Sequence, residues 1–217
     1  VSVELVNVAC FATHLDVPLE VEGFGTVTID TAYGGMFYAM TDATKLGFAI
    51  APHEARELAV LGERIRLAAR ARYPVVHPEN DGISEVSIVQ LHSPFIVPGG
   101  ESRNTCIVAR GRSDRSPTGT GTGLSARLAA LAARGLLGVG DRYDHTSIIG
   151  SRFEGRIVSA GRLGLLPCIV PAIRGRAWIA GFHSYVVDPS DPYPTGYRVA
   201  DTWGVTEGVT QAGGGVA

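Results

Sequence analysis

One segment, Asp114–Gly123, combines residue types that could hold a small charged molecule. Its alternating threonines and glycines leave backbone amides uncovered, directly before a run with helical character. A helix N-terminus presents unpaired N–H groups and a partial positive charge, so it binds carboxylates and phosphates. Asp114 adds a carboxylate at the same mouth. This combination suits a small zwitterion, whose carboxylate would lie on the amides and whose ammonium or imino group would meet Asp114.

The same pattern has a plainer interpretation. A threonine- and glycine-rich helix start is often an ordinary cap, and Asp114 could be a surface turn residue. A nucleotide site fits badly, because no Gly-Lys-Ser/Thr is present and Gly119-x-Gly121-x-Gly123 is not GxGxxG. The pattern therefore leaves a cap and an anion site open.

Other chemistry finds little support. The six histidines include no HxH or HExxH pair, which argues against a metal, and no Gly-x-Ser-x-Gly elbow supports a serine hydrolase. His92 precedes Ser93 and Pro94, so a surface position in a loop is expected. An odd number of cysteines in apolar, strand-like runs predicts buried thiols without a disulfide framework: Cys10, Cys106 and Cys168.

Two helices should position this segment. Pro52 opens the first, in which Leu58, Leu61 and Ile65 recur at helical spacing. The second follows the glycines to about Gly138, and its many alanines suggest a helix wrapped tightly on several sides. Short strand-like runs separated by turns make up most of the rest: 1–13, 17–31, 36–40, 83–91, 104–109, 147–150, 156–159, 167–173 and 177–187. The fold class is therefore α+β with mainly antiparallel sheet.

Composition sets the broad class. Of the 217 residues, 45% are hydrophobic and 18% charged, with a net charge of −2, which argues against nucleic-acid or membrane-surface binding. No apolar run approaches the length of a membrane span and the N-terminus lacks a basic start, so a cytoplasmic protein is expected. The chain begins with Val in strand-like sequence, and we expect further sequence upstream.

Several motifs, in order along the chain, resemble the proline racemase family. Asp114–Thr122 is similar to the family signature DRSPCGTGT, with Thr118 in the Cys position, and Ile29–Tyr38 is similar to D-x-AYGGNFY, departing at Met36. Further matching segments are Asn7–Phe11, Ser102–Asn104, His145–Phe153 and Gly181–His183. Together they extend over roughly residues 7–200, which makes the resemblance far more specific than any one motif.

The resemblance implies a diaminopimelate epimerase-like fold, in which two halves each curl a mainly antiparallel sheet around a central helix. This chain would hold one complete half and strands of the other. The implied boundaries are residues 1–15 for the end of an N-terminal domain, 16–174 for the epimerase-like domain with its central helix at 118–137, 175–200 for strands returning to the N-terminal domain, and 201–217 for a tail.

In racemases of this family, two thiols exchange the α-proton of a proline-like imino acid without a cofactor. A thiol ionises near a pKa of about 8.5 and an unactivated alcohol far above it, so Thr118 cannot replace the second thiol. In this family a Cys–Thr pair implies dehydration of trans-3-hydroxy-L-proline to Δ1-pyrroline-2-carboxylate. Thr118 would occupy the second catalytic position, and Asp114, Gly119 and Thr120 would bind the substrate.

Two alternatives stay open. The first is a proline racemase or 4-hydroxyproline epimerase, against which Thr118 argues. The second is an inactive fragment or imino-acid-binding protein, because the family's MCGHG motif with the first Cys is absent from this chain. The expected partner in each case is a small imino acid, with no metal, nucleic acid or membrane, and a homodimer is kept open.

Overall fold

The computed structural model describes residues 1–108, 112–113 and 120–197. The chain divides into two compact units, Val1–Trp178 and Ile179–Ala217. Every helix and strand of the described residues lies in the first unit, so this unit alone positions the candidate site.

A single ten-stranded sheet forms the frame of the first unit, in the order β1-β10-β9-β8-β6-β5-β4-β3-β2, with the short β7 beside β6. Two neighbouring pairs, β4 with β5 and β6 with β8, are parallel, and the others are antiparallel. This confirms the α+β, mainly antiparallel class. The strands are β1 (Ser2–Val6), β2 (Phe11–Val21), β3 (Gly25–Tyr33), β4 (Phe37–Asp42), β5 (Val86–His92), β6 (Glu101–Val108), β7 (Arg112–Ser113), β8 (Arg142–Ser147), β9 (Arg152–Leu163) and β10 (Leu166–Arg176).

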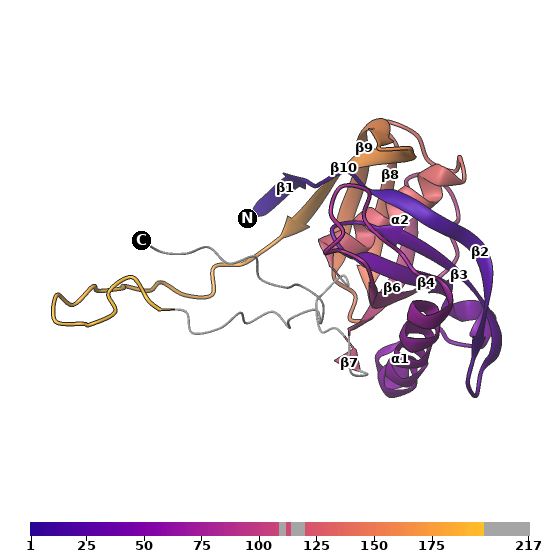
Figure 1. Ribbon diagram of the computed structural model, residues 1–217, viewed down its shortest axis with the longest axis horizontal. Coiled ribbons are helices and arrows are strands. Elements are labelled where there is room, and N and C mark those ends of the chain that lie inside the picture. The colour runs from indigo at the N-terminus through magenta and orange to yellow at the C-terminus, as the bar shows by residue number, and fades with distance from the viewer. Residues whose placement is uncertain (109–111, 114–119, 198–217) are drawn as a thin grey trace, which may run out of the picture. The chain divides into compact units, whose positions relative to one another are not determined.

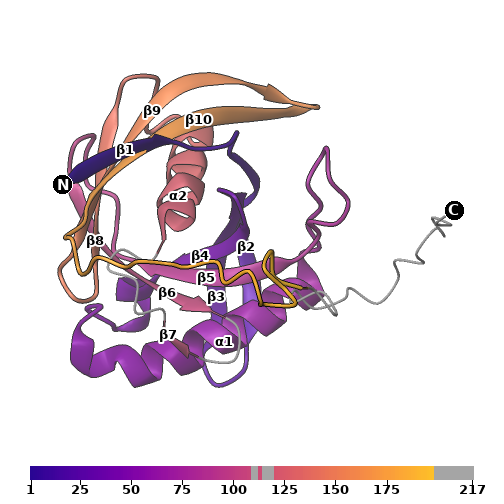
Figure 2. The ribbon, with the colours of Figure 1, turned by 90° about the vertical axis from the view of Figure 1, so that its left-hand side faces the viewer.

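Helix α2 (Gly121–Ala133) lies inside the curl of this sheet, as Figures 1 and 2 show. It packs against β2, β3, β4, β9 and β10 and is buried without interruption from Gly123 to Leu131. Small side chains such as Ala126 and Ala130 let the strands approach from several sides. The prediction of a central helix enclosed by a curled sheet is confirmed.

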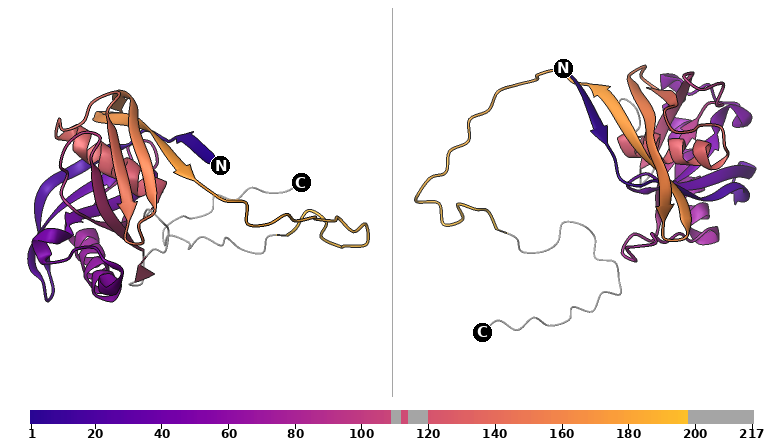
Figure 3. Two further views of the ribbon diagram at one scale, coloured as in Figure 1. Left: turned by 180° about the vertical axis from the view of Figure 1, so that it is seen from behind. Right: turned by 90° about the horizontal axis from the view of Figure 1, so that it is seen from above.

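Helix α1 (Ala55–Arg72) covers the outer face of the sheet, against β2, β5 and β6 (Figure 3). Two short 3₁₀ turns, η1 (Ala43–Leu46) and η2 (Pro52–Glu54), precede it. Its buried stripe includes Leu58, Leu61 and Ile65, the positions that the helical spacing predicted. Gly62 lets the helix approach β6, because a Cβ there would lie 2.3 Å from Ile107 Cγ1.

The central strand β4 is buried on both faces because it lies between these two helices. Along β4, Phe37 and Ala39 join the cluster under α1, whereas Tyr38 and Met40 join the cluster against α2. Successive side chains of a strand point to opposite faces, so a strand covered on both sides buries consecutive residues in two different clusters. Each helix therefore rests on its own face of the sheet.

The structure corrects three element predictions. Residues 17–31 are not one run but the β2–β3 hairpin, which turns at Gly23. The alternation continued through the turn because inward residues of both strands, such as Val21 and Val27, are buried in one core. Residues 148–150 form a turn after β8. Helix α2 is shorter than the predicted 118–137, since Thr120 caps its start and Gly135, at φ +71°, follows its end.

The predicted strand at 177–187 is also wrong, because residues 177–197 form no helix or strand. A strand exists only when a neighbour completes its ladder of hydrogen bonds. Within residues 177–197, only Ala177 bonds to a neighbouring strand, donating its N–H to Val1 O at 3.0 Å. The predicted tail, 201–217, lies outside the described residues. In the described part of the chain, no helix has the length and apolarity that crossing a membrane requires.

Candidate functional site at the N-terminus of the central helix

The predicted anion cradle is the first turn of α2. Thr120 is the N-cap residue, with extended backbone (φ −145°, ψ 156°), and its hydroxyl accepts a hydrogen bond from Gly123 N at 2.8 Å. Leu124 N donates to Thr120 O at 3.1 Å, which begins the helix ladder. The N–H groups of Gly121 and Thr122 therefore have no acceptor among the described residues. Thr120 was predicted here, whereas Asp114, Thr118 and Gly119 lie outside the described residues.

Three hydroxyls close over this turn. Tyr38 of β4 contacts both threonine hydroxyls, at 2.7 Å for Thr122 and more closely for Thr120, and the two threonines lie 2.7 Å from each other. Thr120 thus uses its hydroxyl as a cap and within this triangle. Its contribution to an anion site then comes from the backbone it positions, and the sequence reasoning missed Tyr38 as a partner.

The turn between β3 and β4 packs directly on the backbone of α2. A Cβ on Gly34 would lie 2.1 Å from Thr122 O and 2.4 Å from Ala126 N, so only glycine fits. Gly35 has φ +110°. The AYGG motif therefore has a physical role in this chain, because its glycines allow the β3–β4 turn to support the first turn of α2.

Asn7 links the β3–β4 turn to the first turns of α2. Its side-chain amide donates to Gly34 O at 3.0 Å and contacts Ser125 Oγ at 2.8 Å, while Ser125 Oγ donates to Gly121 O at 2.8 Å. Segments far apart in the chain thus hold one another in place around the helix start. The family-like segments at Asn7–Phe11 and Ile29–Tyr38 were the only sequence signal for these contacts.

A cavity of about 480 Å³ lies over the helix start. Leu5, Phe153 and Ile173 give it apolar walls, Arg176 adds a cation, and Thr120 and Thr122 belong to its lining. Free N–H groups at one end and apolar walls around them can take a carboxylate attached to a small ring.

None of the three cysteines lines this cavity. All three are free and buried, as predicted. Burial raises the pKa of the Cys10 thiol to about 12, so this group stays protonated near neutral pH and cannot serve as a base. A thiol base for this site would have to come from residues other than Cys10, Cys106 and Cys168.

The surface position predicted for His92 is wrong. His92 ends strand β5, is 5% exposed, and lies in the core near Arg127. Burial, and then the charge of Arg127, hold its pKa well below 6.5, so the ring is neutral. The loop prediction failed because only the following Ser93 and Pro94 leave the sheet. Among the described residues no group of three or more His, Cys, Asp or Glu side chains could hold a metal ion.

A curled, mainly antiparallel sheet around a helix with an exposed N-terminal turn defines the class of diaminopimelate epimerase-like proteins. Residues 1–198 match the family described as proline racemase, and the chain belongs to this family.

Two crystal structures are similar to this chain at 37% sequence identity. One is a hydroxyproline epimerase from Agrobacterium vitis with bound trans-4-hydroxy-L-proline, with a TM-score of 0.77 over 94% of this chain and 57% of that chain. The other is a probable proline racemase from Agrobacterium radiobacter K84 with bound carbonate, with a TM-score of 0.76 over 94% and 59%. The chain therefore spans less than two thirds of the length of either protein.

Proposed function

We propose that the full-length protein acts at Cα of a proline-like imino acid at the N-terminus of α2. The free N–H groups of Gly121 and Thr122 would hold the substrate carboxylate, together with Gly119 and Thr120. Asp114 would receive the imino group. Membership of the proline racemase family and the trans-4-hydroxy-L-proline bound to a protein of 37% identity support this substrate class.

We propose further that the reaction is dehydration of trans-3-hydroxy-L-proline. The observation that carries this proposal is Thr118 in the position of the second racemase Cys. A thiolate from outside this chain would take the α-proton, the electron pair would form the Cα–Cβ double bond, and the 3-hydroxyl would leave as water once protonated. The resulting enamine becomes Δ1-pyrroline-2-carboxylate. The Thr118 hydroxyl is far too weak an acid to protonate Cα near neutral pH, so reprotonation from the opposite face does not compete.

The helix dipole helps the first step. Removing an α-proton next to a carboxylate develops enediolate charge, and donors aimed at that charge stabilise the transition state. The N–H groups of the α2 cap lie in a fixed turn, held by Gly34 and by the Tyr38–Thr120–Thr122 triangle. They would need little rearrangement as the charge forms.

A second candidate is 4-hydroxyproline epimerase or proline racemase, which the two similar crystal structures favour. A third is an imino-acid-binding protein without catalysis, favoured by the burial of all three cysteines of this chain.

On the proposed domain division, residues 1–15 and 175–200 pack on an N-terminal half and residues 16–174 form the epimerase-like domain. The exposed apolar side chains of Val3, Leu5 and Trp178 support this contact.

The test incubates the full-length protein, and the 217-residue chain alongside it, with trans-3-hydroxy-L-proline, trans-4-hydroxy-L-proline and L-proline. Dehydration is detected as loss of one water by mass spectrometry, and epimerisation by chiral separation without a change of mass. Inversion of L-proline or trans-4-hydroxy-L-proline, with no loss of water from the 3-hydroxy compound, would refute the dehydratase proposal. Binding without any turnover would select the third candidate.

Two variants test the residue roles. Thr118→Cys should add epimerisation of trans-4-hydroxy-L-proline, whereas the matched Thr118→Ser should keep dehydration alone. Asp114→Ala should abolish imino-acid binding measured by calorimetry, and Asp81→Ala, an exposed carboxylate elsewhere, should leave it unchanged. Unchanged binding in Asp114→Ala would remove the role proposed for that carboxylate.

A further inference from the structure

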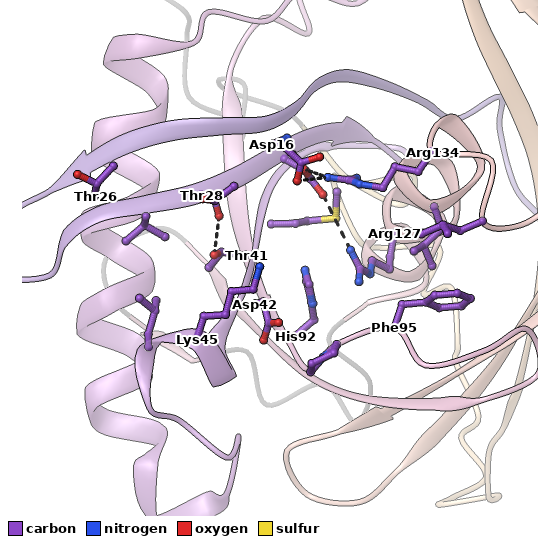
Figure 4. A pocket seen from close by; sticks show the side chains of 17 residues that line it. Asp16, Thr26, Thr28, Thr41, Asp42, Lys45, His92, Phe95, Arg127 and Arg134 are labelled. Atoms are coloured by element: carbon purple, nitrogen blue, oxygen red, sulfur yellow. Dashed lines mark hydrogen bonds and ion pairs between the residues drawn. The ribbon is translucent and has the colours of Figure 1, made fainter.

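A second cavity, of about 500 Å³, lies beside the later turns of α2 (Figure 4). Strands β2 to β5, the α2 residues Arg127 and Leu131, and the C-cap residue Arg134 line it. It shares no lining residue with the cavity at the helix start. Its size is that of sites for small molecules. The proposed function makes no use of this cavity.

The three carboxylates of this cavity already have partners. Arg134 Nη2 donates to Asp30 Oδ1 at 2.5 Å and to Asp16 Oδ1 at 2.8 Å. Asp42 accepts from the backbone N–H of Thr44 at 3.0 Å and from its hydroxyl at 2.6 Å, which caps η1. The negative charges therefore have no need of a ligand cation.

The arginines are paired less completely within the described part of the chain. Arg127 is 5% exposed, yet it makes no hydrogen bond within the described part of the chain, and its closest carboxylate oxygen, Asp30 Oδ2, is 4.0 Å away. Its Nε and the Nη1 of Arg134 are buried without a partner in the same residues. A buried guanidinium that has one carboxylate at 4.0 Å but no hydrogen bond is poorly compensated, so this geometry favours a bound anion. Figure 4 shows Arg127 pointing into the cavity toward His92.

The other lining residues indicate what the rest of a bound ligand would be like. Phe95, Leu131 and Leu136 offer apolar surface close to Arg127. His92 Nδ1 lies 2.8 Å from Ser93 O, and because a carbonyl only accepts, Nδ1 carries the proton and Nε2 is an acceptor. A multiply charged anion fits poorly, since the two paired carboxylates of Asp16 and Asp30 are close by.

We propose that this cavity is a second ligand site, which binds a small organic monocarboxylate with an apolar body through Arg127. The carboxylate pairs with the Arg127 guanidinium, and the apolar body lies against Phe95 and Leu136. The site is separate from the imino-acid site, and the proposal does not depend on the reaction at α2.

The test uses the full-length protein with phenylacetate as the probe, followed by calorimetry and by the shift of the thermal unfolding midpoint. Phenylacetate should bind, whereas its neutral analogue phenylacetamide should bind at least about tenfold more weakly, the effect of losing one charged hydrogen bond. Inorganic phosphate should also bind at least about tenfold more weakly, because it has no apolar body and its higher charge is repelled by Asp16 and Asp30. Equal binding of the amide would overturn the role of Arg127, and equal binding of phosphate would overturn the apolar, monoanionic assignment.

Variants place the binding in this cavity. Arg127→Met should weaken phenylacetate binding by about 10- to 100-fold. The control Arg56→Met, which removes an exposed arginine of α1, and Asp114→Ala, at the imino-acid site, should both leave it unchanged. If Arg127→Met does not fold, His92→Phe, which fills the cavity and removes the Nε2 acceptor, should still weaken binding. Unchanged binding in both cavity variants, or loss in Asp114→Ala, would overturn the proposal.

Discussion

The two ends of α2 differ in which hydrogen-bond donors they offer to a ligand. At its start, neutral hydroxyls and amides satisfy one another, and the donors left without an acceptor among the described residues are the backbone N–H groups of Gly121 and Thr122. Beside its later turns, the backbone donors are consumed within the helix and the free donors belong to Arg127 and Arg134. Only the first turn of a helix can bind an anion with its backbone, so any site farther along must use side chains and bear their desolvation.

Among the changes proposed here, removal of the Asp30 carboxylate beside Arg127 and Arg134 should lower the stability of the protein most. Asp30 is 6% exposed and pairs with Arg134, with Arg127 at 4.0 Å. Asp30→Asn takes the carboxylate at 4.0 Å away from the buried Arg127 guanidinium and leaves Arg134 with Asp16 alone, so it should lower the free energy of unfolding by about 3–5 kcal/mol. Urea denaturation measures this loss, and Asp81→Asn, at an exposed position, serves as the control. A loss below 1 kcal/mol, roughly the level of a surface pair, would contradict the dependence of this end on Asp30.

At the N-terminal turn of α2, Gly34→Ala should have the largest effect on stability. The added methyl would lie 2.1 Å from Thr122 O and 2.4 Å from Ala126 N, and backbone cannot give way as a flexible side chain can. We expect a loss of about 3 kcal/mol, at the upper end of the usual cost of overpacking, together with loss of imino-acid binding. Gly161→Ala in β9, where nothing lies within 4 Å of the added Cβ, is the matched control. Wild-type stability in Gly34→Ala would show that the turn does not support the helix start.

Lower pH should destabilise the region around Arg127, beside the later turns of α2. His145 of β8 is fully buried, both ring nitrogens lack a partner among the described residues, and burial and then Arg127 lower its pKa from 6.5 to about 3. The folded state keeps the His145 ring neutral, whereas the unfolded chain binds a proton there as the pH falls below 6.5. The part of the folding stability that depends on neutral His145 is therefore complete above pH 6.5 and is lost as the pH falls toward 3.

The variant His145→Phe removes this proton linkage. Between pH 6 and 4, its free energy of unfolding should fall less steeply than that of the wild type, by about 1.4 kcal/mol per pH unit. Urea midpoints across this range measure the slope, and the values above pH 7.5 serve as the internal reference. Parallel slopes would mean that His145 is protonated in the folded state.

The hydroxyl triangle should show the smallest effect. Tyr38→Phe keeps the ring in the core and removes one hydroxyl from its contacts with Thr120 and Thr122. We expect a loss of about 1 kcal/mol in stability and weaker imino-acid binding. Tyr33→Phe, whose ring packs between Phe11 and Phe37 in the other cluster, is the control for binding. Equal binding of all three proteins would separate the triangle from the site.

Local pattern predicted what depends on local chemistry. Helical spacing located α1 through Leu58, Leu61 and Ile65, and the apolar surroundings of the cysteines predicted their burial. The pattern failed at residues 17–31, because a hairpin keeps the same faces inward on both strands, and at 177–187, where residues with strand character have no neighbour to pair with. Periodicity reports which side of a segment is apolar, not which partner that segment has.

By itself the sequence determined the family, the α+β class and the substitution at Thr118, because these depend on residue identity in order along the chain. Tertiary structure alone decided that Tyr38 and Gly34 support the start of α2, and that His92 is buried beside Arg127. Those contacts join residues separated by tens of positions, across a sheet whose curl no local pattern encodes. Whether a polar group has an acceptor is a property of that packed arrangement, which is why the buried Arg127 Nε without a hydrogen-bond partner among the described residues became visible only in three dimensions.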